Sequence, residues 1–217
     1  MVLSGKKIAF LGDSITEGVG ATSEDKIYHQ VLKSIAGLDE AVNYGISGTR
    51  IANQKFPSES PETDYYFASR VDGMRDDVDA VVVFGGTNDY GHGDAPFGTF
   101  ADNDVDTFYG ACHVLMQKLI NKYPDKPIVF MTPLHRINEM DSMANGIPKN
   151  LTLSDYVYAL REVAEYYSVP VLDLYASGGM QPNVEVQNKH YFADGLHPND
   201  NGHAQIANKL KTFLESL

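Results

Sequence analysis

Short runs of consecutive apolar residues alternate along the chain with segments in which apolar residues recur every three or four positions. Each run is apolar on both faces and rich in Val, Ile and Phe, which is typical of strands buried in a parallel sheet. We predict five such strands, at residues 7–11, 41–44, 80–84, 128–131 and 169–174.

The segments between these strands have helical spacing. The first apolar stripe begins at Ile27, and Gly37 follows it in a position that is typical of a helix end. Ser154 is the expected N-cap of a later helix. Further helices are predicted from the apolar stripes at residues 108–119, 156–167 and 206–217, and also at residues 65–74.

Strands that alternate with helices indicate an α/β fold with a central parallel sheet of about five strands and helices on both faces. No repeat or linker-like composition divides the chain, so we predict a single domain over residues 1–217. Loops of unusual length in such a domain are expected to include binding loops or lids. The long connections are residues 49–79, 90–104, 133–153 and 175–198.

Small and polar residues follow the first four predicted strands. They are residues 12–14, 45–48 and 85–89, and His135 after the fourth strand. Ligands of parallel α/β sheets bind at the carboxyl ends of the strands. We therefore expect the functional site at this edge of the sheet.

Ser14 is the first candidate for chemistry, because it lies on a tight turn directly after a buried strand. A serine hydroxyl is a weak nucleophile and needs a neighbouring base. His197 can accept its proton at neutral pH, and Asp194, three residues earlier, can orient the other ring nitrogen.

Acyl transfer also needs hydrogen-bond donors for the oxyanion that forms on the substrate carbonyl. Gly48 lies in a turn and could bring its backbone N–H close to a substrate. The side-chain amide of Asn88 and the backbone N–H of Ser14 are further candidate donors.

Four sequence blocks carry a family resemblance: GDSITEG (12–18), NYGISG (43–48), GTND (86–89) and DGLHPN (194–199). In order and spacing they resemble the motif blocks of the SGNH, or GDSL-type, serine esterases and lipases. Ile15 stands where the family name has leucine, which is a conservative difference.

The resemblance implies a flavodoxin-like three-layer α/β/α sandwich, the SGNH hydrolase fold, with no metal and no organic cofactor. It implies that Ser14 is the nucleophile, His197 the base and Asp194 its partner. Ser14, Gly48 and Asn88 then form the oxyanion hole.

The implied activity is hydrolysis of carboxylic esters in two steps, through an acyl-enzyme on a Ser-His-Asp triad. We expect short acyl esters, such as O-acetyl groups on a carbohydrate or another small molecule. A lysophospholipase or thioesterase that acts on longer acyl chains is the alternative. Candidate substrate contacts are Asp13, Tyr90 and His135, and an anionic substrate group could contact Arg50 or Arg136.

The composition narrows the choice of partner. The 217 residues are 43% hydrophobic and 21% charged, as in ordinary globular proteins. The net charge is −12, from 17 basic and 29 acidic residues, which argues against nucleic acid and anionic membranes as partners. The sequence does not predict an oligomeric state.

The chain shows neither a signal-peptide pattern at its start nor an apolar run of membrane-spanning length, so we expect a cytoplasmic protein without a membrane partner. In this setting we interpret the glycosylation sequence that begins at Asn150 as a chance match. The single cysteine, Cys112, is expected to be a small buried apolar residue.

Two alternatives belong to other functional classes. A flavodoxin-like phosphate- or nucleotide-binding module would use Ser14, Thr16 and Gly18 as a phosphate cradle, without hydrolytic activity. A metal-dependent phosphatase would instead use acidic residues near the strand ends, namely Asp13, Asp89 and Asp173.

Overall fold

The computed structural model describes residues 1–141, 143–144, 147–148 and 151–217. Asn150, where the glycosylation sequence begins, and part of the long connection at residues 133–153 lie outside the described residues.

A sheet of five parallel strands, in the order β2-β1-β3-β4-β7, forms the centre of the fold. This confirms the predicted α/β class and the number of strands. The first four strands lie within one residue of the predicted bounds. The strands are β1 (Lys7–Gly12), β2 (Glu40–Gly45), β3 (Ala80–Phe84), β4 (Ile128–Met131) and β7 (Val171–Leu172).

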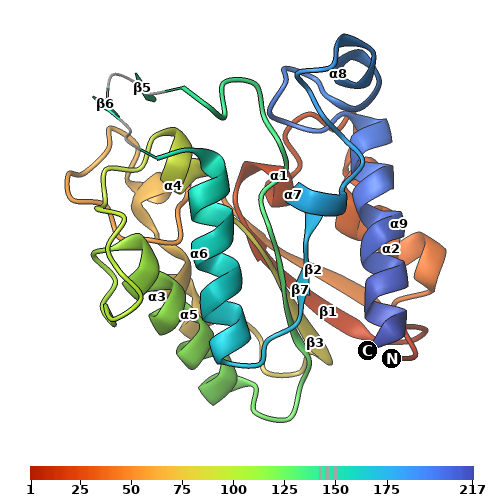
Figure 1. The fold of residues 1–217 in the computed structure, drawn as a ribbon. Helices are drawn as coiled ribbons and strands as arrows, with labels where there is room; N and C mark the ends of the chain where they lie inside the picture. The colour runs from red at the N-terminus through yellow and green to blue at the C-terminus, as the bar shows by residue number, and fades with distance from the viewer. Residues whose placement is uncertain (142, 145–146, 149–150) are drawn as a thin grey trace.

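Side chains of each strand alternate between two hydrophobic cores, one on each face of the sheet. In β1, Ile8 and Phe10 belong to one core, and Ala9 and Leu11 belong to the other. Three layers result, with the sheet in the middle (Figure 1). The first core is covered by α2 (Tyr28–Ala36) and α9 (Asp200–Ser216), and the second by α3 (Phe67–Arg70), α5 (Phe108–Lys122) and α6 (Leu153–Tyr166).

Short helices gather at one end of the sheet, where the strands have their carboxyl ends (Figure 1, top). They are α1 (Ser14–Glu17), α4 (Thr87–Gly91), α7 (Leu174–Ser177) and α8 (Glu185–Tyr191). The antiparallel strands β5 (Met143–Ala144) and β6 (Ile147–Pro148) lie at the same end, opposite the two termini. Short 3-10 helices occur at Glu24–Lys26, Pro61–Asp64 and Val71–Gly73.

The N-cap predicted for α6 is wrong, because Thr152 and not Ser154 occupies that position. The carboxylate of Asp155 accepts hydrogen bonds from the backbone N–H of Thr152 at 2.7 Å and from its hydroxyl at 2.9 Å. Because this acid, three residues after the cap, reaches back to it, the helix begins two residues earlier than expected.

The last strand is shorter than predicted, because Asp173 ends it and caps α7 by accepting a hydrogen bond from the N–H of Ala176 at 2.9 Å. The helix predicted at residues 65–74 is divided into α3 and a 3-10 turn. The stretch at residues 175–198, predicted to be a long connection, contains α8. No residue of α8 is buried, so this helix has no apolar stripe that the sequence pattern could have revealed.

Cys112 is buried in α5, as predicted, and burial raises the pKa of its thiol. No helix within the described residues is long and apolar enough to cross a membrane.

Two histidines are buried together in the core beneath α2 and α9. His29 Nε2 lies 3.0 Å from the carbonyl oxygen of Thr16, and His203 Nδ1 accepts a hydrogen bond from the N–H of Tyr28 at 3.3 Å. Burial lowers the pKa of each ring from 6.5 to about 4. Both rings therefore stay neutral in the folded protein at pH values where an exposed histidine is protonated.

We predict that His29→Gln reduces the pH dependence of stability. Between pH 6.5 and 4 the unfolded chain binds a proton at His29 that the folded chain does not, so wild-type stability falls as the pH falls through this window. At pH 5 this contribution amounts to about 2 kcal/mol. Urea unfolding at pH 7.5 and pH 5 should therefore show that the difference between wild type and His29→Gln shrinks by about this amount at the lower pH.

His190→Gln is the matched control, because the ring of His190 is exposed on α8. Its difference from wild type should be the same at both pH values. An equal pH dependence in wild type and His29→Gln would contradict a neutral buried ring.

Candidate active site

The turn after β1 brings Ser14 to the edge of the sheet as the first residue of α1. Asp13 caps this helix, because its carboxylate accepts a hydrogen bond from the N–H of Ile15 at 3.0 Å. Gly45, at the end of β2, lies so close to α1 that a Cβ atom would overlap the backbone nitrogen of Glu17. The first turn of α1 can therefore pack directly on the end of the neighbouring strand.

Ser14, His197 and Asp194 form one chain of hydrogen-bonded side chains. The hydroxyl oxygen of Ser14 lies 3.0 Å from His197 Nε2, and His197 Nδ1 lies 2.7 Å from Asp194 Oδ2. Ser14 is 6% exposed, whereas the side chain of Asp194 is 54% exposed. These hydrogen-bonded side chains thus run from a buried hydroxyl to a carboxylate at the surface.

The loop that carries Asp194 and His197 is held by the aspartate itself. Its Oδ1 atom accepts hydrogen bonds from the backbone N–H groups of Leu196 at 2.9 Å and His197 at 2.7 Å. Partial burial alone would raise the pKa of Asp194, but the bonds from the His197 ring and the two backbone groups outweigh it, so the pKa is lowered. Asp194 therefore remains ionised beside the imidazole.

The candidate oxyanion donors lie across from this loop. Asn88, in α4, donates from Nδ2 to the carbonyl oxygen of Thr49 at 3.0 Å, so its amide lies beside the turn that contains Gly48. Gly48 has a φ of +75°, a conformation that favours glycine. Within the described residues its N–H donates to no protein acceptor, and the N–H of Ser14, as the first of a helix, has no partner within that helix. All three groups remain able to donate a hydrogen bond to a ligand.

Three residues that the sequence analysis did not assign to the site hold the turn at Gly48 in place. Glu17 accepts hydrogen bonds from the N–H and the hydroxyl of Ser47. Asp89, considered only as a metal ligand, accepts from the N–H groups of residues 51 and 52 at 3.0 and 2.9 Å. Arg70 donates to the carbonyl oxygens at the ends of β1 and β2, at 3.0 and 2.8 Å, and to the hydroxyl of Thr49 at 3.2 Å.

Two of these roles had a signal in the sequence, since Glu17 and Asp89 lie inside the GDSITEG and GTND blocks. Arg70 had none, because it lies in a long connection without a motif.

Two buried carboxyl groups lie beside the candidate nucleophile and the turn at Gly48. Burial raises the pKa of Asp13 to about 6, although the Ile15 N–H and the charges of His197 and Arg70 lower it. Burial likewise raises the pKa of Asp89 to about 6, against the opposing effect of its backbone hydrogen bonds. The site thus contains carboxyl groups that titrate nearer to neutral pH than ordinary aspartates do.

The three candidate substrate contacts take different positions. Asp13 is buried and bonded to the turn of α1, and Tyr90 is buried with its hydroxyl donating to the carbonyl oxygen of Asn138 at 2.7 Å. His135 is half-buried, with Nδ1 2.9 Å from Glu139 and its ring centre 3.9 Å from that of Tyr175. Their contact with a substrate stays a prediction.

The structure supports neither alternative class from the sequence analysis. The hydroxyl of Thr16 is buried and lies 3.0 Å from the hydroxyl of Tyr28, so it does not face a phosphate. Asp173 pairs with Arg161 at 3.1 Å. Within the described part of the chain, no three His, Cys, Asp or Glu side chains are grouped so that they could hold a metal ion.

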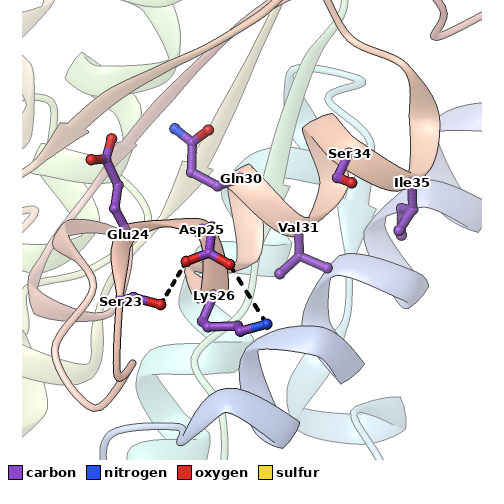
Figure 2. Close-up of a pocket in the computed structure, with 8 residues that line it drawn as sticks. All are labelled: Ser23, Glu24, Asp25, Lys26, Gln30, Val31, Ser34 and Ile35. Carbon is purple, nitrogen blue, oxygen red and sulfur yellow. Dashed lines mark hydrogen bonds and ion pairs between the residues drawn. The ribbon is translucent and has the colours of Figure 1, made fainter.

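A cavity of about 670 Å³ lies elsewhere on the surface, against α2 (Figure 2). Its rim includes a hydrogen bond of 2.6 Å between Ser23 and Asp25 and an ion pair of 3.6 Å between Asp25 and Lys26. None of the candidate catalytic or oxyanion residues lines it. The residues that do are Ser23, Glu24, Asp25, Lys26, Gln30, Val31, Ser34 and Ile35.

Comparison with known proteins identifies the family. The sequence matches the model of the GDSL-like lipase/acylhydrolase family over residues 10–205. The chain belongs to this family. The GDSL-like assignment confirms the resemblance seen in the four motif blocks, and it makes the protein a carboxylic ester hydrolase.

Solved structures share the fold of this chain. A protein from Lactobacillus plantarum is 36% identical, with a TM-score of 0.84 over 99% of this chain and 98% of that one. A member of the lipolytic G-D-S-L family from Veillonella parvula is 17% identical, with a TM-score of 0.65 over 97% and 99% of the two chains. A two-domain esterase active on acetylated mannans is 20% identical, with a TM-score of 0.62 over 99% of this chain and 49% of that one. A comparison with curated proteins finds no match.

We predict that Asn88→Ala lowers kcat by about a hundredfold or more, with little change in KM. An oxyanion donor acts on charge that develops in the transition state, and removal of one donor typically costs about 3 kcal/mol of barrier. Steady-state kinetics on a p-nitrophenyl ester would measure the effect.

Asn208→Ala is the matched control, because Asn208 bonds only within α9, to the carbonyl oxygen of Ala204. Thermal unfolding of both variants would separate a catalytic effect from loss of the Asn88–Thr49 bond. A folded Asn88→Ala protein with near-normal kcat would remove Asn88 from the oxyanion hole.

Proposed function

We propose that this GDSL-like enzyme hydrolyses short-chain carboxylic esters through an acyl-enzyme on Ser14. The observation that carries the proposal is the hydrogen-bonded chain from Ser14 through His197 to Asp194, with distances of 3.0 and 2.7 Å. A hydroxyl beside an imidazole that is itself oriented by a carboxylate is the arrangement that serine nucleophiles require.

In the first step His197 Nε2 takes the proton of Ser14 as the hydroxyl oxygen attacks the ester carbonyl. Asp194 holds the ring so that Nε2 faces the serine, and it stabilises the imidazolium that forms. The N–H groups of Ser14 and Gly48 and the amide of Asn88 donate to the oxyanion. The bond to the alcohol then breaks, and the alcohol leaves with the proton from His197.

In the second step water replaces the alcohol. His197 takes a proton from the water, which attacks the acyl carbonyl, and Ser14 recovers its proton when the acid leaves. Each proton that His197 accepts is returned within the same step, so the two steps regenerate the enzyme.

We propose O-acetyl groups on a carbohydrate or a small molecule as the substrates. Acetylated mannans, on which one structural neighbour is active, belong to the same chemical class of esters.

We predict that Ser14→Ala abolishes hydrolysis of p-nitrophenyl acetate, butyrate and octanoate, because the acyl-enzyme can no longer form. Wild type should hydrolyse acetate and butyrate faster than octanoate. Release of p-nitrophenol, followed by absorbance, measures both effects. Ser69→Ala, which removes a surface hydroxyl bonded to the carbonyl oxygen of Tyr66, is the matched control and should retain activity.

Activity that survives in Ser14→Ala would show that another group is the nucleophile. A strong preference of wild type for octanoate would instead favour a lysophospholipase or thioesterase with a longer acyl site.

A further inference from the structure

We propose that Arg136 binds an anionic group of the ester substrate, so that the enzyme prefers esters with a carboxylate close to the scissile bond. This inference rests on the proposed function, since it names the class of substrate for the site at Ser14.

Arg136 lies between the two halves of the candidate active site. Its Nη1 atom donates to the carbonyl oxygen and the hydroxyl of Thr87, at 3.2 and 3.3 Å, and Thr87 directly precedes Asn88 in α4. The next residue, Ile137, donates its N–H to the carbonyl oxygen of Gly195 at 2.9 Å, inside the loop that carries Asp194 and His197. The guanidinium of Arg136 thus contacts the residue before Asn88, and the backbone next to Arg136 is bonded to the loop that carries Asp194 and His197.

The positive charge of Arg136 is not neutralised by an ion pair within the described residues. Its Nη1 bonds go to uncharged oxygens, its buried Nε has no partner, and no described residue accepts from Nη2. The guanidinium carbon lies 5.7 Å from the ring centre of Tyr90, a contact that leaves the charge in place.

Two other arginines near the site, the buried Arg50 and the half-buried Arg70, show the contrast with the half-buried Arg136. Arg50 forms an ion pair with Asp64 at 3.1 Å, and the charges of Asp89 and Asp94 also favour its protonated form. Arg70 uses both of its Nη atoms to bond the strand ends and the hydroxyl of Thr49. Nε has no partner in any of the three arginines. Arg136 differs from Arg50 because it has no described ion pair, and from Arg70 because no described residue accepts a hydrogen bond from its Nη2 atom.

A cation that is partly removed from water and not paired is costly, and a substrate anion could replace the lost hydration. Burial lowers the pKa of Arg136, against the charges of Tyr90, Asp13, Asp194 and Glu139, which agrees with a partly desolvated group close to Asp13 and Asp194. A carboxylate bound by the guanidinium, whose Nη1 atom bonds Thr87, would lie close to Asn88 of the candidate oxyanion hole. The guanidinium would then orient the ester rather than take part in bond breaking.

Because the net charge of the protein is −12, a preference for anionic esters would indicate that a local cation binds them. A strongly acidic protein repels anionic esters in general, so a preference for them has to come from a local cation. The same repulsion disfavours polyanions, so we expect small substrates with a single acidic group.

Two pairs of esters test the inference, each matched except for one charge. The pair 4-acetoxybenzoate and methyl 4-acetoxybenzoate places the carboxylate on the alcohol side. The pair mono-p-nitrophenyl glutarate and p-nitrophenyl pentanoate places it on the acyl side, with spontaneous hydrolysis subtracted. The readout is the ratio of kcat/KM for the anionic ester to that for the neutral ester.

We predict a ratio of about ten or more in wild type for at least one pair, mainly through a lower KM. In Arg136→Gln the ratio should fall to one or below, because the repulsion of the acidic protein is then unopposed. Arg136→Lys should keep part of the preference, since it retains a charge without the fork of the guanidinium. High salt should lower the wild-type ratio.

Arg161→Gln is the matched control for net charge, because it removes the same charge from the surface of α6, where Arg161 pairs with Asp173. Its ratio should equal that of wild type. If wild type hydrolyses neutral esters but its kcat/KM ratio is near one, this inference is wrong and the proposed function stands. The same holds if the ratio is high and remains high in Arg136→Gln. Absence of hydrolysis of all four esters would overturn the proposed function and this inference with it.

Discussion

The first turn of α1 lies directly against the end of β2, because Gly45 has no side chain to keep them apart. This contact sets the distance between the candidate nucleophile, at the start of α1, and the turn that follows β2. Glu17, at the other end of α1, reinforces it by accepting two hydrogen bonds from Ser47. Ser14 and Gly48 are therefore positioned by the same packing contact, which explains why both lie at the edge of neighbouring strands.

Buried charge supports the same region. Arg70 bonds the ends of β1 and β2 and the hydroxyl of Thr49, while Asp89 binds two backbone N–H groups further along the same loop. A carboxylate or guanidinium that is removed from water is costly unless it makes hydrogen bonds, so the bonds of Asp89 and of the Arg70 Nη atoms hold the backbone in one arrangement. Preorganised donors of this kind stabilise developing charge without having to rearrange during the reaction.

Much of the fold and of the candidate site could be predicted from the sequence, for reasons that particular residues make clear. The strands are continuous apolar runs, and the residues of the site follow them in recognisable blocks such as GTND. The sequence did not reveal α8, which buries no residue, or the short helices α1 and α4, which are too brief to show a period. It also could not reveal the role of Arg70, because that role depends on carbonyl groups that only the folded chain brings together.

The hydrogen bond between Ser14 and His197 joins residues that are 183 positions apart. Closing so large a loop costs conformational entropy that the packing of the sheet and the terminal helix α9 must offset, so we expect this contact to form late in folding. Any species in which α9 is detached lacks the base even when its nucleophile is already in place. The appearance of esterase activity during refolding would therefore report that the whole chain, including α9, has folded, and not only that the sheet has formed.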